Sequence, residues 1–158
     1  MSNLTDISDV IIIGSGPAGL SAAIYVVRAG LSVNVIEKEF MGTGQIADSS
    51  KVDNYLGIPA ISGYDLGESF REHALSLGVT IEDNNVTRLT PVDDIWELEL
   101  SDGSTKKARC VIYAAGCSHK KLQAENEEQY TGKGISYCAV CDGAFYKDKD
   151  VAVVHSTF

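Results

Sequence analysis

The sequence has few basic residues and no cluster of them. Its 13 Lys and Arg residues are outnumbered by 22 Asp and Glu residues, which gives a formal net charge of −9. Binding to nucleic acid depends mainly on clustered Lys and Arg side chains that neutralise phosphates. An acidic surface also disfavours an anionic membrane. We therefore expect neither a nucleic-acid partner nor a membrane partner.

The sequence also lacks an uninterrupted apolar run long enough to span a bilayer. Residues 10–30 are apolar overall, but glycines and a proline interrupt them and Arg28 lies among them. Residues 1–9 contain no basic residue, so they lack the positive flank of a secretory signal. These absences predict a cytoplasmic protein. In that reducing compartment, cysteines are more often thiols, metal ligands or catalytic pairs than structural disulfides.

The first part of the chain has the element order of a doubly wound α/β fold. A β-branched run at 9–13 meets a glycine-rich turn, and a helix at 18–29 and a strand at 31–36 follow. These elements predict a parallel βαβ unit with a right-handed crossover. Helical spacing of apolar residues returns at 65–77 and ends at Gly78.

A small antiparallel excursion is predicted next, with Asn84-Asn85 and Asp102-Gly103 as turn signals. Its four short strands are expected at 79–81, 86–89, 95–100 and 105–108. An apolar strand at 110–115 then suits a buried parallel sheet. A charged linker, residues 119–133, and a last strand at 151–154 complete the expected order.

The glycine-rich turn has the G-x-G-x-x-G spacing. In this motif the first glycine makes the turn, the second admits a pyrophosphate, and the helix N-terminus stabilises the negative charge. A tight structural turn can also be rich in glycine, but the position between a strand and a helix favours a dinucleotide site. Its residues are Gly14, Ser15, Gly16, Pro17, Ala18 and Gly19.

Glu37 follows the second predicted strand, about 20 residues beyond the glycines, where a carboxylate can bind the diol of an adenosine ribose. The alternative is a solvated glutamate at a strand end, and the glycine turn favours the ribose contact. Lys38 is a further candidate for the cofactor site, but it gives no clear argument for a 2′-phosphate. NADP is therefore not expected at this site.

Two cysteines, Cys138 and Cys141, have the C-x-x-C spacing. Such a pair can close a small disulfide ring, and nearby positive potential activates its thiolates for redox exchange. A zinc site would need four ligands, but Cys110, Cys117 and His119 supply no second C-x-x-C pair. We therefore predict redox chemistry and no metal.

Asp142 adjoins the second cysteine, where a carboxylate can exchange protons with a thiolate. An Asp-Gly turn formed for backbone reasons explains the same residue equally well, so both interpretations remain open. Outside this motif, Cys110 and Cys117 are expected to be buried or partly buried structural thiols. The three histidines are expected at the surface: His73, His119 and His155.

Together these segments resemble the low-molecular-weight, bacterial-type thioredoxin reductases. The resemblance runs along nearly the whole chain, because four motifs occur together at the family's spacing and in its order. They are GSGPAGLSAAIYVVRAG, GTGQIADSSKVDNYLG, VIYAAG and GKGISYCAVCDGAFYKDKDVAVV. The implied fold is α/β, a Rossmann-like FAD-binding βαβ unit with a small antiparallel β excursion.

The resemblance implies FAD as the cofactor, with its pyrophosphate at the glycine turn and its ribose at Glu37. Further residues implied at the cofactor, the first three of them beside the isoalloxazine ring, are Gly44, Gln45, Asn54, Val86, Ala115 and Gly116. In that family Cys141 matches the cysteine that faces the flavin and Cys138 the one that attacks the partner's disulfide. Asp142 matches the general acid/base.

The chain departs mildly from the family pattern at Leu56, where proline is usual, and at Ala115 and Cys117 around Gly116. The larger departure is at residues 155–158, where the family begins a second glycine-rich turn for NADPH. The resemblance therefore implies an incomplete protein, without the NADPH domain and without the C-terminal half of the FAD domain. Unpaired sheet edges then predict a homodimer or another oligomer.

The expected domains are residues 1–120, the N-terminal part of the FAD domain, and residues 121–158, a linker with the start of the NADPH and redox-disulfide domain. The expected function is that of a flavin-dependent disulfide oxidoreductase of the thioredoxin-disulfide reductase class. Electrons would pass from NADPH through FAD and the cysteine pair to thioredoxin or a similar redox protein, although this chain alone is not expected to turn over NADPH. The alternatives are a ferredoxin-linked or other flavin-thiol reductase and a non-catalytic FAD-binding fragment.

Overall fold

The computed structural model describes residues 7–154, so that residues 1–6 and the predicted surface position of His155 lie outside the described part. The chain divides into two compact units, Met1–Gly116 and Cys117–Phe158. The predicted domain boundary after residue 120 stays a prediction. No described helix is both long enough and apolar enough to cross a bilayer.

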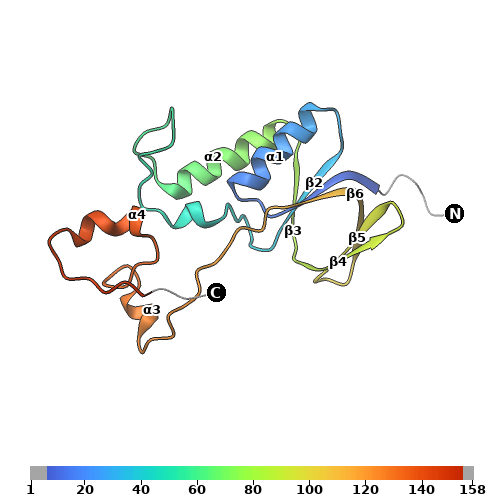
Figure 1. Cartoon of the computed structure of the whole chain (residues 1–158). Helices are drawn as coiled ribbons and strands as arrows, with labels where there is room; N and C mark the ends of the chain where they lie inside the picture. Colours follow the sequence, from blue (N-terminus) through green and yellow to red (C-terminus); the bar gives the residue numbers. More distant parts are fainter. Residues whose placement is uncertain (1–6, 155–158) are drawn as a thin grey trace. The chain divides into compact units, whose positions relative to one another are not determined.

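The first unit begins with the predicted βαβ unit (Figure 1). Strand β1 (Ile7–Ile13) leads into helix α1 (Pro17–Arg28), and strand β2 (Val33–Glu37) follows. Pro17 is the first residue of α1, a position where its missing N–H costs no helical hydrogen bond. β1 and β2 pair in parallel, with Val10 opposite Val33. The βαβ unit predicted from the sequence is therefore confirmed.

Six strands form one sheet in the order β3-β2-β1-β6-β5-β4. The remaining strands are β3 (Thr80–Asp83), β4 (Val86–Val92), β5 (Ile95–Leu100) and β6 (Thr105–Tyr113). The pairs β1–β2, β1–β6 and β2–β3 are parallel, whereas β4–β5 and β5–β6 are antiparallel. The α/β fold is confirmed, with a parallel half and an antiparallel half in the same sheet.

Two of the predicted strand assignments were wrong. The segment at 79–81, expected in the antiparallel excursion, forms β3 and pairs in parallel with β2, because helix α2 (Gly63–Ser76) provides a crossover between them. The segments at 105–108 and 110–115 are one strand, β6, since no turn residue separates Ala108 from Cys110. The start of β6 pairs with β5, and most of its length pairs with β1.

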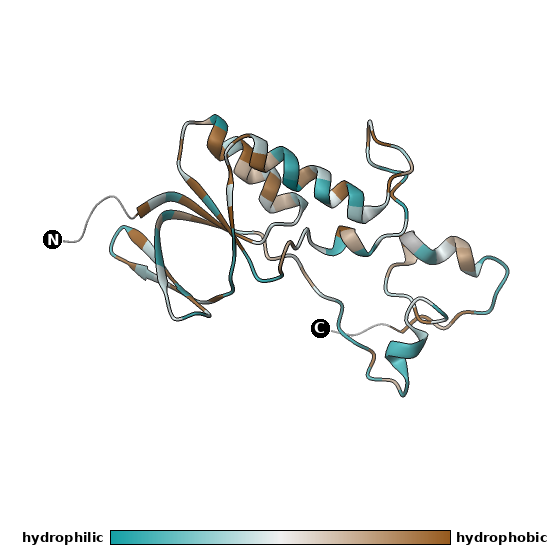
Figure 2. Cartoon of the chain, turned by 180° about the vertical axis from the view of Figure 1, so that it is seen from behind, coloured by the Kyte–Doolittle hydropathy of each residue, from teal (hydrophilic) through white to brown (hydrophobic). Residues whose placement is uncertain are grey.

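The core lies on both faces of the parallel strands. Helices α1 and α2 run side by side along one face (Figure 1), over a cluster that includes Ile12, Leu20 and Val35. The opposite face of the sheet holds a second cluster, which includes Ile11, Ile36 and Leu98. Burial on both faces explains why β1 is apolar at the consecutive positions 10–13 and β2 at 35–36. Figure 2 shows brown, apolar segments within the strands of the sheet.

The second unit contains short elements only. They are α3 (Glu127–Tyr130), α4 (Ala139–Asp142) and the 3₁₀ turn η3 (Gly143–Tyr146), so the predicted linker at 119–133 includes one helical turn. The strand predicted at 151–154 is not formed. A strand needs a neighbour for its backbone hydrogen bonds, and no described residue of this unit pairs with the segment, which leaves Val153 89% exposed.

Candidate functional site

Two of the three motif glycines are required by the fold itself. Gly14 has φ +104°, and a Cβ added there would lie 2.4 Å from the carbonyl oxygen of Ala114. A Cβ on Gly19 would lie 1.9 Å from the carbonyl oxygen of Gly14, so glycine allows α1 to pack closely on the turn. The Gly14 N–H donates to the Ile36 carbonyl at 2.8 Å. The turn is therefore fixed against the ends of β2 and β6.

The second motif glycine, Gly16, is not required by the fold. Its backbone has the ordinary angles φ −65° and ψ 177°, and an added Cβ would make ordinary van der Waals contact with the Gly44 Cα at 3.8 Å and the Thr43 carbonyl oxygen at 3.9 Å. Gly16 is the N-cap of α1, and the first turn of that helix holds no acidic side chain. A helix N-terminus without an acidic side chain suits an anionic group such as a pyrophosphate. The residues present thus fit a dinucleotide.

Glu37 holds the glycine turn in place through hydrogen bonds. Its Oε2 atom accepts from the Ser15 N–H at 2.8 Å and lies 2.9 Å from the Ser15 hydroxyl, while its Oε1 atom accepts from the Glu39 N–H at 3.0 Å. Glu37 is 7% exposed and Ser15 is fully buried. The alternative interpretation of Glu37 as a solvated strand-end residue is therefore wrong. Its predicted contact with a ribose stays a prediction.

The hydrogen bonds also set the acidity of Glu37. Burial raises the pKa of the carboxyl, but the bonds from Ser15, Glu39 and Lys38 outweigh it and hold the pKa below 4.5. A carboxylate with a lowered pKa stabilises the fold above its unfolded-state pKa, and this contribution is lost as the pH falls through the folded-state value. Protonation of Glu37 at low pH therefore destabilises the turn.

We expect Glu37→Gln to remove part of the acid sensitivity of folding. Wild type should lose stability as the pH falls below about 4.5, whereas the variant should be less stable at pH 7 and show a flatter dependence over this range. The measurement is urea unfolding followed by circular dichroism at several pH values. Glu39→Gln, at an exposed neighbouring carboxylate, is the control. Parallel pH curves for Glu37→Gln and wild type would contradict this role.

The loop before the 3₁₀ turn η2 (Gln45–Asp48) lies directly against the glycine turn. Gly44 has φ +79°, and its added Cβ would be 3.0 Å from the Cα of Gly16. Gln45 follows at the start of η2. On the other side, the Cα of Ala115 lies 3.1 Å from the Cβ position of Gly14. The structure thus brings Gly44 and Ala115 to the turn, as expected of one site.

The other predicted cofactor residues have no described contact with the glycine turn. Asn54 is exposed, in a loop whose ends are joined by the Val52–Ile61 bridge. Val86 packs against the core cluster beneath the hairpin. Lys38 is exposed and forms an ion pair with Glu39, and Gly116 is exposed at the end of the first unit. Their roles at a cofactor stay predictions.

Sequence reasoning missed the role of Gly42 in this turn. The Ser15 hydroxyl is within hydrogen-bonding distance of the Gly42 carbonyl oxygen as well as Glu37. A Cβ on Gly42 would lie 3.2 Å from the Glu37 carboxyl carbon, so glycine leaves room for that side chain. The only signal in the sequence was a second glycine, two residues before Gly44.

The cysteine motif lies in the second unit. Cys138 is half-buried and disulfide-bonded, while the Cys141 side chain lies outside the described part. The Ser136 hydroxyl donates to Asp142 Oδ2 at 2.7 Å and accepts from the Cys138 N–H at 3.2 Å. Ser136 therefore connects the backbone of Cys138 to the carboxylate of Asp142.

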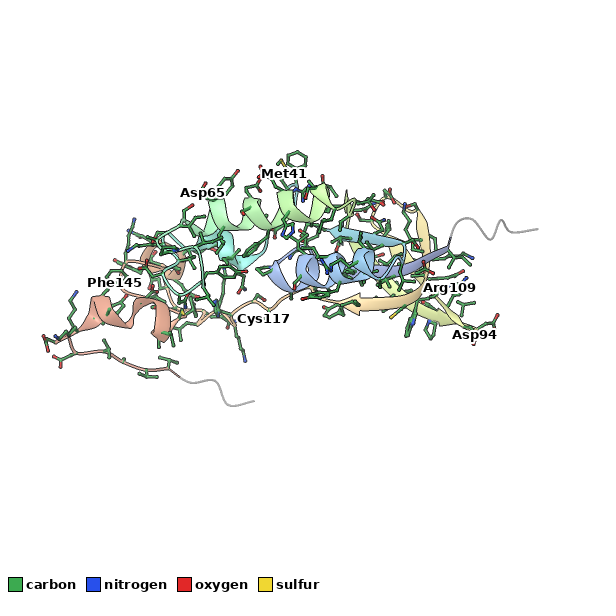
Figure 3. All side chains as sticks on the ribbon, turned by 90° about the horizontal axis from the view of Figure 1, so that it is seen from above. Met41, Asp65, Asp94, Arg109, Cys117 and Phe145 are labelled. Atoms are coloured by element: carbon green, nitrogen blue, oxygen red, sulfur yellow. The ribbon has the colours of Figure 1, made fainter. Side chains whose placement is uncertain are left out.

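The expectation that Cys110 and Cys117 are buried was wrong, because both are exposed. Helix α1 packs on β1 and β2 and does not cover Cys110, which lies on β6. Cys117 lies in the segment after β6 (Figure 3). His73 and His119 are exposed, as predicted. Among the side chains that the structure describes, which exclude that of Cys141, no group of His, Cys, Asp and Glu is arranged to hold a metal ion.

A parallel βαβ unit with a glycine turn at a helix N-terminus is the architecture of the Rossmann-like, dinucleotide-binding class of folds. The profile of the pyridine nucleotide-disulphide oxidoreductases matches residues 8–155. The chain therefore belongs to this family.

The named relatives include thioredoxin reductases. That of Bacillus subtilis is 44% identical over 150 residues, which cover 94% of this chain and 46% of the relative. The crystal structure of thioredoxin reductase from Streptococcus pyogenes superposes with a TM-score of 0.80 at 38% identity, over 90% of this chain and 46% of that one. The ferredoxin-flavin thioredoxin reductase from Clostridium acetobutylicum gives 0.68 at 35% identity, over 90% and 48%. The resemblance seen in the sequence is confirmed, and the chain spans about half the length of these relatives.

Proposed function

We propose that the chain is the FAD-binding and redox-disulfide part of a flavin-dependent disulfide oxidoreductase that reduces thioredoxin or a similar protein. The observation that carries this proposal is the glycine turn at the N-terminus of α1, in which backbone packing requires Gly14 and Gly19 but not Gly16. The likeness to thioredoxin reductases supports the choice of FAD over other dinucleotides.

The first unit would bind the cofactor without rearrangement. The N-terminus of α1 would face the pyrophosphate, and Gly16 would allow it to approach the backbone. The bonds between Ser15 and Glu37 hold the backbone of this turn in place before binding, which lowers the entropic cost of binding. Bound FAD would supply two-electron redox chemistry, for which the chain provides position and electrostatics.

The second unit would carry the thiol exchange. The reduced Cys138 thiolate attacks one sulfur of the partner's disulfide, and the partner's other sulfur leaves as a thiolate. The Cys141 thiolate then attacks Cys138 in this mixed disulfide and releases the partner's second thiolate. Two electrons pass to the partner, whose thiolates take up two protons, and a Cys138–Cys141 disulfide remains. Asp142, held by Ser136, would accept a proton from one of the cysteine thiols beforehand.

Titration with FAD tests the proposal directly. Purified chain should either carry visible flavin absorption or bind one equivalent of added FAD, with a change in flavin fluorescence. Circular dichroism shows whether the sample is folded. Folded chain that is colourless and does not bind added FAD would refute the cofactor assignment.

A ferredoxin-linked reductase is a second candidate, supported by the likeness to the Clostridium acetobutylicum enzyme. The two candidates differ only in the electron donor. Anaerobic addition of NADPH or of reduced ferredoxin to the FAD-loaded protein in a form as long as its relatives separates them, since flavin absorption bleaches on reduction. Bleaching by ferredoxin alone favours the second candidate, and bleaching by NADPH alone favours the first.

A further inference from the structure

A buried carboxylate lies close in the chain to the cysteine motif. Glu127, in α3, is only 7% exposed. Its Oε1 atom accepts from the Leu122 N–H at 3.1 Å, and its Oε2 atom lies 3.3 Å from the Ala124 N–H. The Tyr137 hydroxyl also donates to Oε1. Glu127 thus joins the loop at 122–124 to the residue that precedes Cys138.

Tyr137 is held on two sides. Its hydroxyl is bound by Glu127, and its ring stacks on the His119 ring, with centroids 5.3 Å apart and an interplanar angle of 11°. The hydrogen bond from Tyr137 is the main reason why the pKa of Glu127 lies below its ordinary value. The ring and hydroxyl together leave the Tyr137 side chain little freedom.

The contacts of Tyr137 with Glu127 and His119 fix the backbone directly before the cysteine motif. Tyr137 lies between Ser136, which binds Asp142 Oδ2, and Cys138, whose N–H donates to the Ser136 hydroxyl. A phenylalanine would fill the same space at position 137, so packing alone does not account for the hydroxyl. Burying a carboxylate also costs free energy that its hydrogen bonds must offset, so stability alone does not explain Glu127.

We propose that Glu127 and Tyr137 are positioning residues that hold Cys138 in the orientation needed for disulfide closure. The inference rests on the proposed function, in which Cys138 and Cys141 exchange two electrons with a partner. Fixing the backbone at residue 137 raises the effective concentration of the Cys138 sulfur at its partner. Loss of the hydrogen bond between Tyr137 and Glu127 should therefore favour the dithiol over the disulfide.

The test is the redox equilibrium of the 158-residue chain with glutathione, in a background that carries Cys110→Ser and Cys117→Ser. The reaction converts the dithiol and glutathione disulfide into the protein disulfide and two glutathione thiols, with transfer of two electrons. Tyr137→Phe and Glu127→Gln should lower the equilibrium constant for disulfide formation roughly tenfold. Glu128→Gln is the matched control, because it removes the same charge from the same helix at a side chain that is 86% exposed.

The outcomes separate the inference from the proposed function. If the parent chain forms no internal disulfide, the proposed function fails. If it does and Tyr137→Phe has the same equilibrium constant, the positioning role is refuted. An equal loss in Glu128→Gln also refutes it, because the effect would then come from charge alone. Should Tyr137→Phe unfold the chain by circular dichroism, Glu127→Gln, which keeps the shape and one acceptor oxygen, decides the question.

Discussion

Replacing Gly16 by alanine should weaken FAD binding strongly while the chain stays folded. The added Cβ meets no protein atom closer than 3.8 Å and the backbone angles suit any residue, so the cost in stability should be at most about 1 kcal/mol. In the proposed site, the same methyl group would hinder the close approach of the pyrophosphate to the Gly16 backbone. We expect FAD affinity to fall by at least roughly 100-fold, measured by fluorescence titration alongside thermal unfolding.

Two further variants of α1 serve as comparisons for Gly16→Ala. Gly19→Ala places a Cβ 1.9 Å from the Gly14 carbonyl oxygen, so it should destabilise the fold by more than about 3 kcal/mol. Ser21→Ala, at an exposed position of α1, should change neither stability nor affinity appreciably. If Gly16→Ala bound FAD as tightly as wild type, the pyrophosphate would have to lie elsewhere.

The second large effect should separate the two cysteines of the motif. A reduced Cys141→Ser chain should form a stable mixed disulfide through Cys138 with a thioredoxin whose single remaining cysteine is activated as an aromatic disulfide. The adduct persists because no second thiol of the chain can displace the partner. Cys138→Ser should form it at least roughly 1000-fold more slowly, because the attacking thiolate is missing. Non-reducing electrophoresis over time measures both rates.

The exposed cysteines require a control in this experiment. Cys110 and Cys117 are accessible to the same reagent, so both are replaced by serine in every variant. A chain that lacks all four thiols sets the background. Equal rates for Cys138→Ser and Cys141→Ser would contradict the assignment of Cys138 as the attacking residue.

The sequence predicted the parts of the fold that depend on local pattern. The βαβ unit follows from apolar periodicity and from glycines at fixed spacing, and both are visible in one short segment. The parallel pairing of β3 with β2 and the continuity of β6 depend on contacts between distant segments. Short strands of similar composition do not specify their neighbours, so these assignments were wrong.

The same distinction holds for the site. The glycine turn and the cysteine motif were found because each is a short pattern in the sequence. The bonds of Glu37 to Ser15 cross 22 residues and that of Tyr137 to Glu127 crosses ten. No local spacing encodes such pairs, and only the folded chain shows them. Cys110 was misjudged because an apolar strand was taken to be covered on both faces.

Strand β6 connects the glycine turn to the hairpin formed by β4 and β5. Its start is bonded to β5, and the chain just beyond its end donates from the Ala114 N–H to the Ile13 carbonyl, beside Gly14. Fraying of the hairpin would therefore loosen the support on which the first motif glycine rests. A hairpin remote in sequence from the glycine turn would in this way determine how long the turn keeps its conformation.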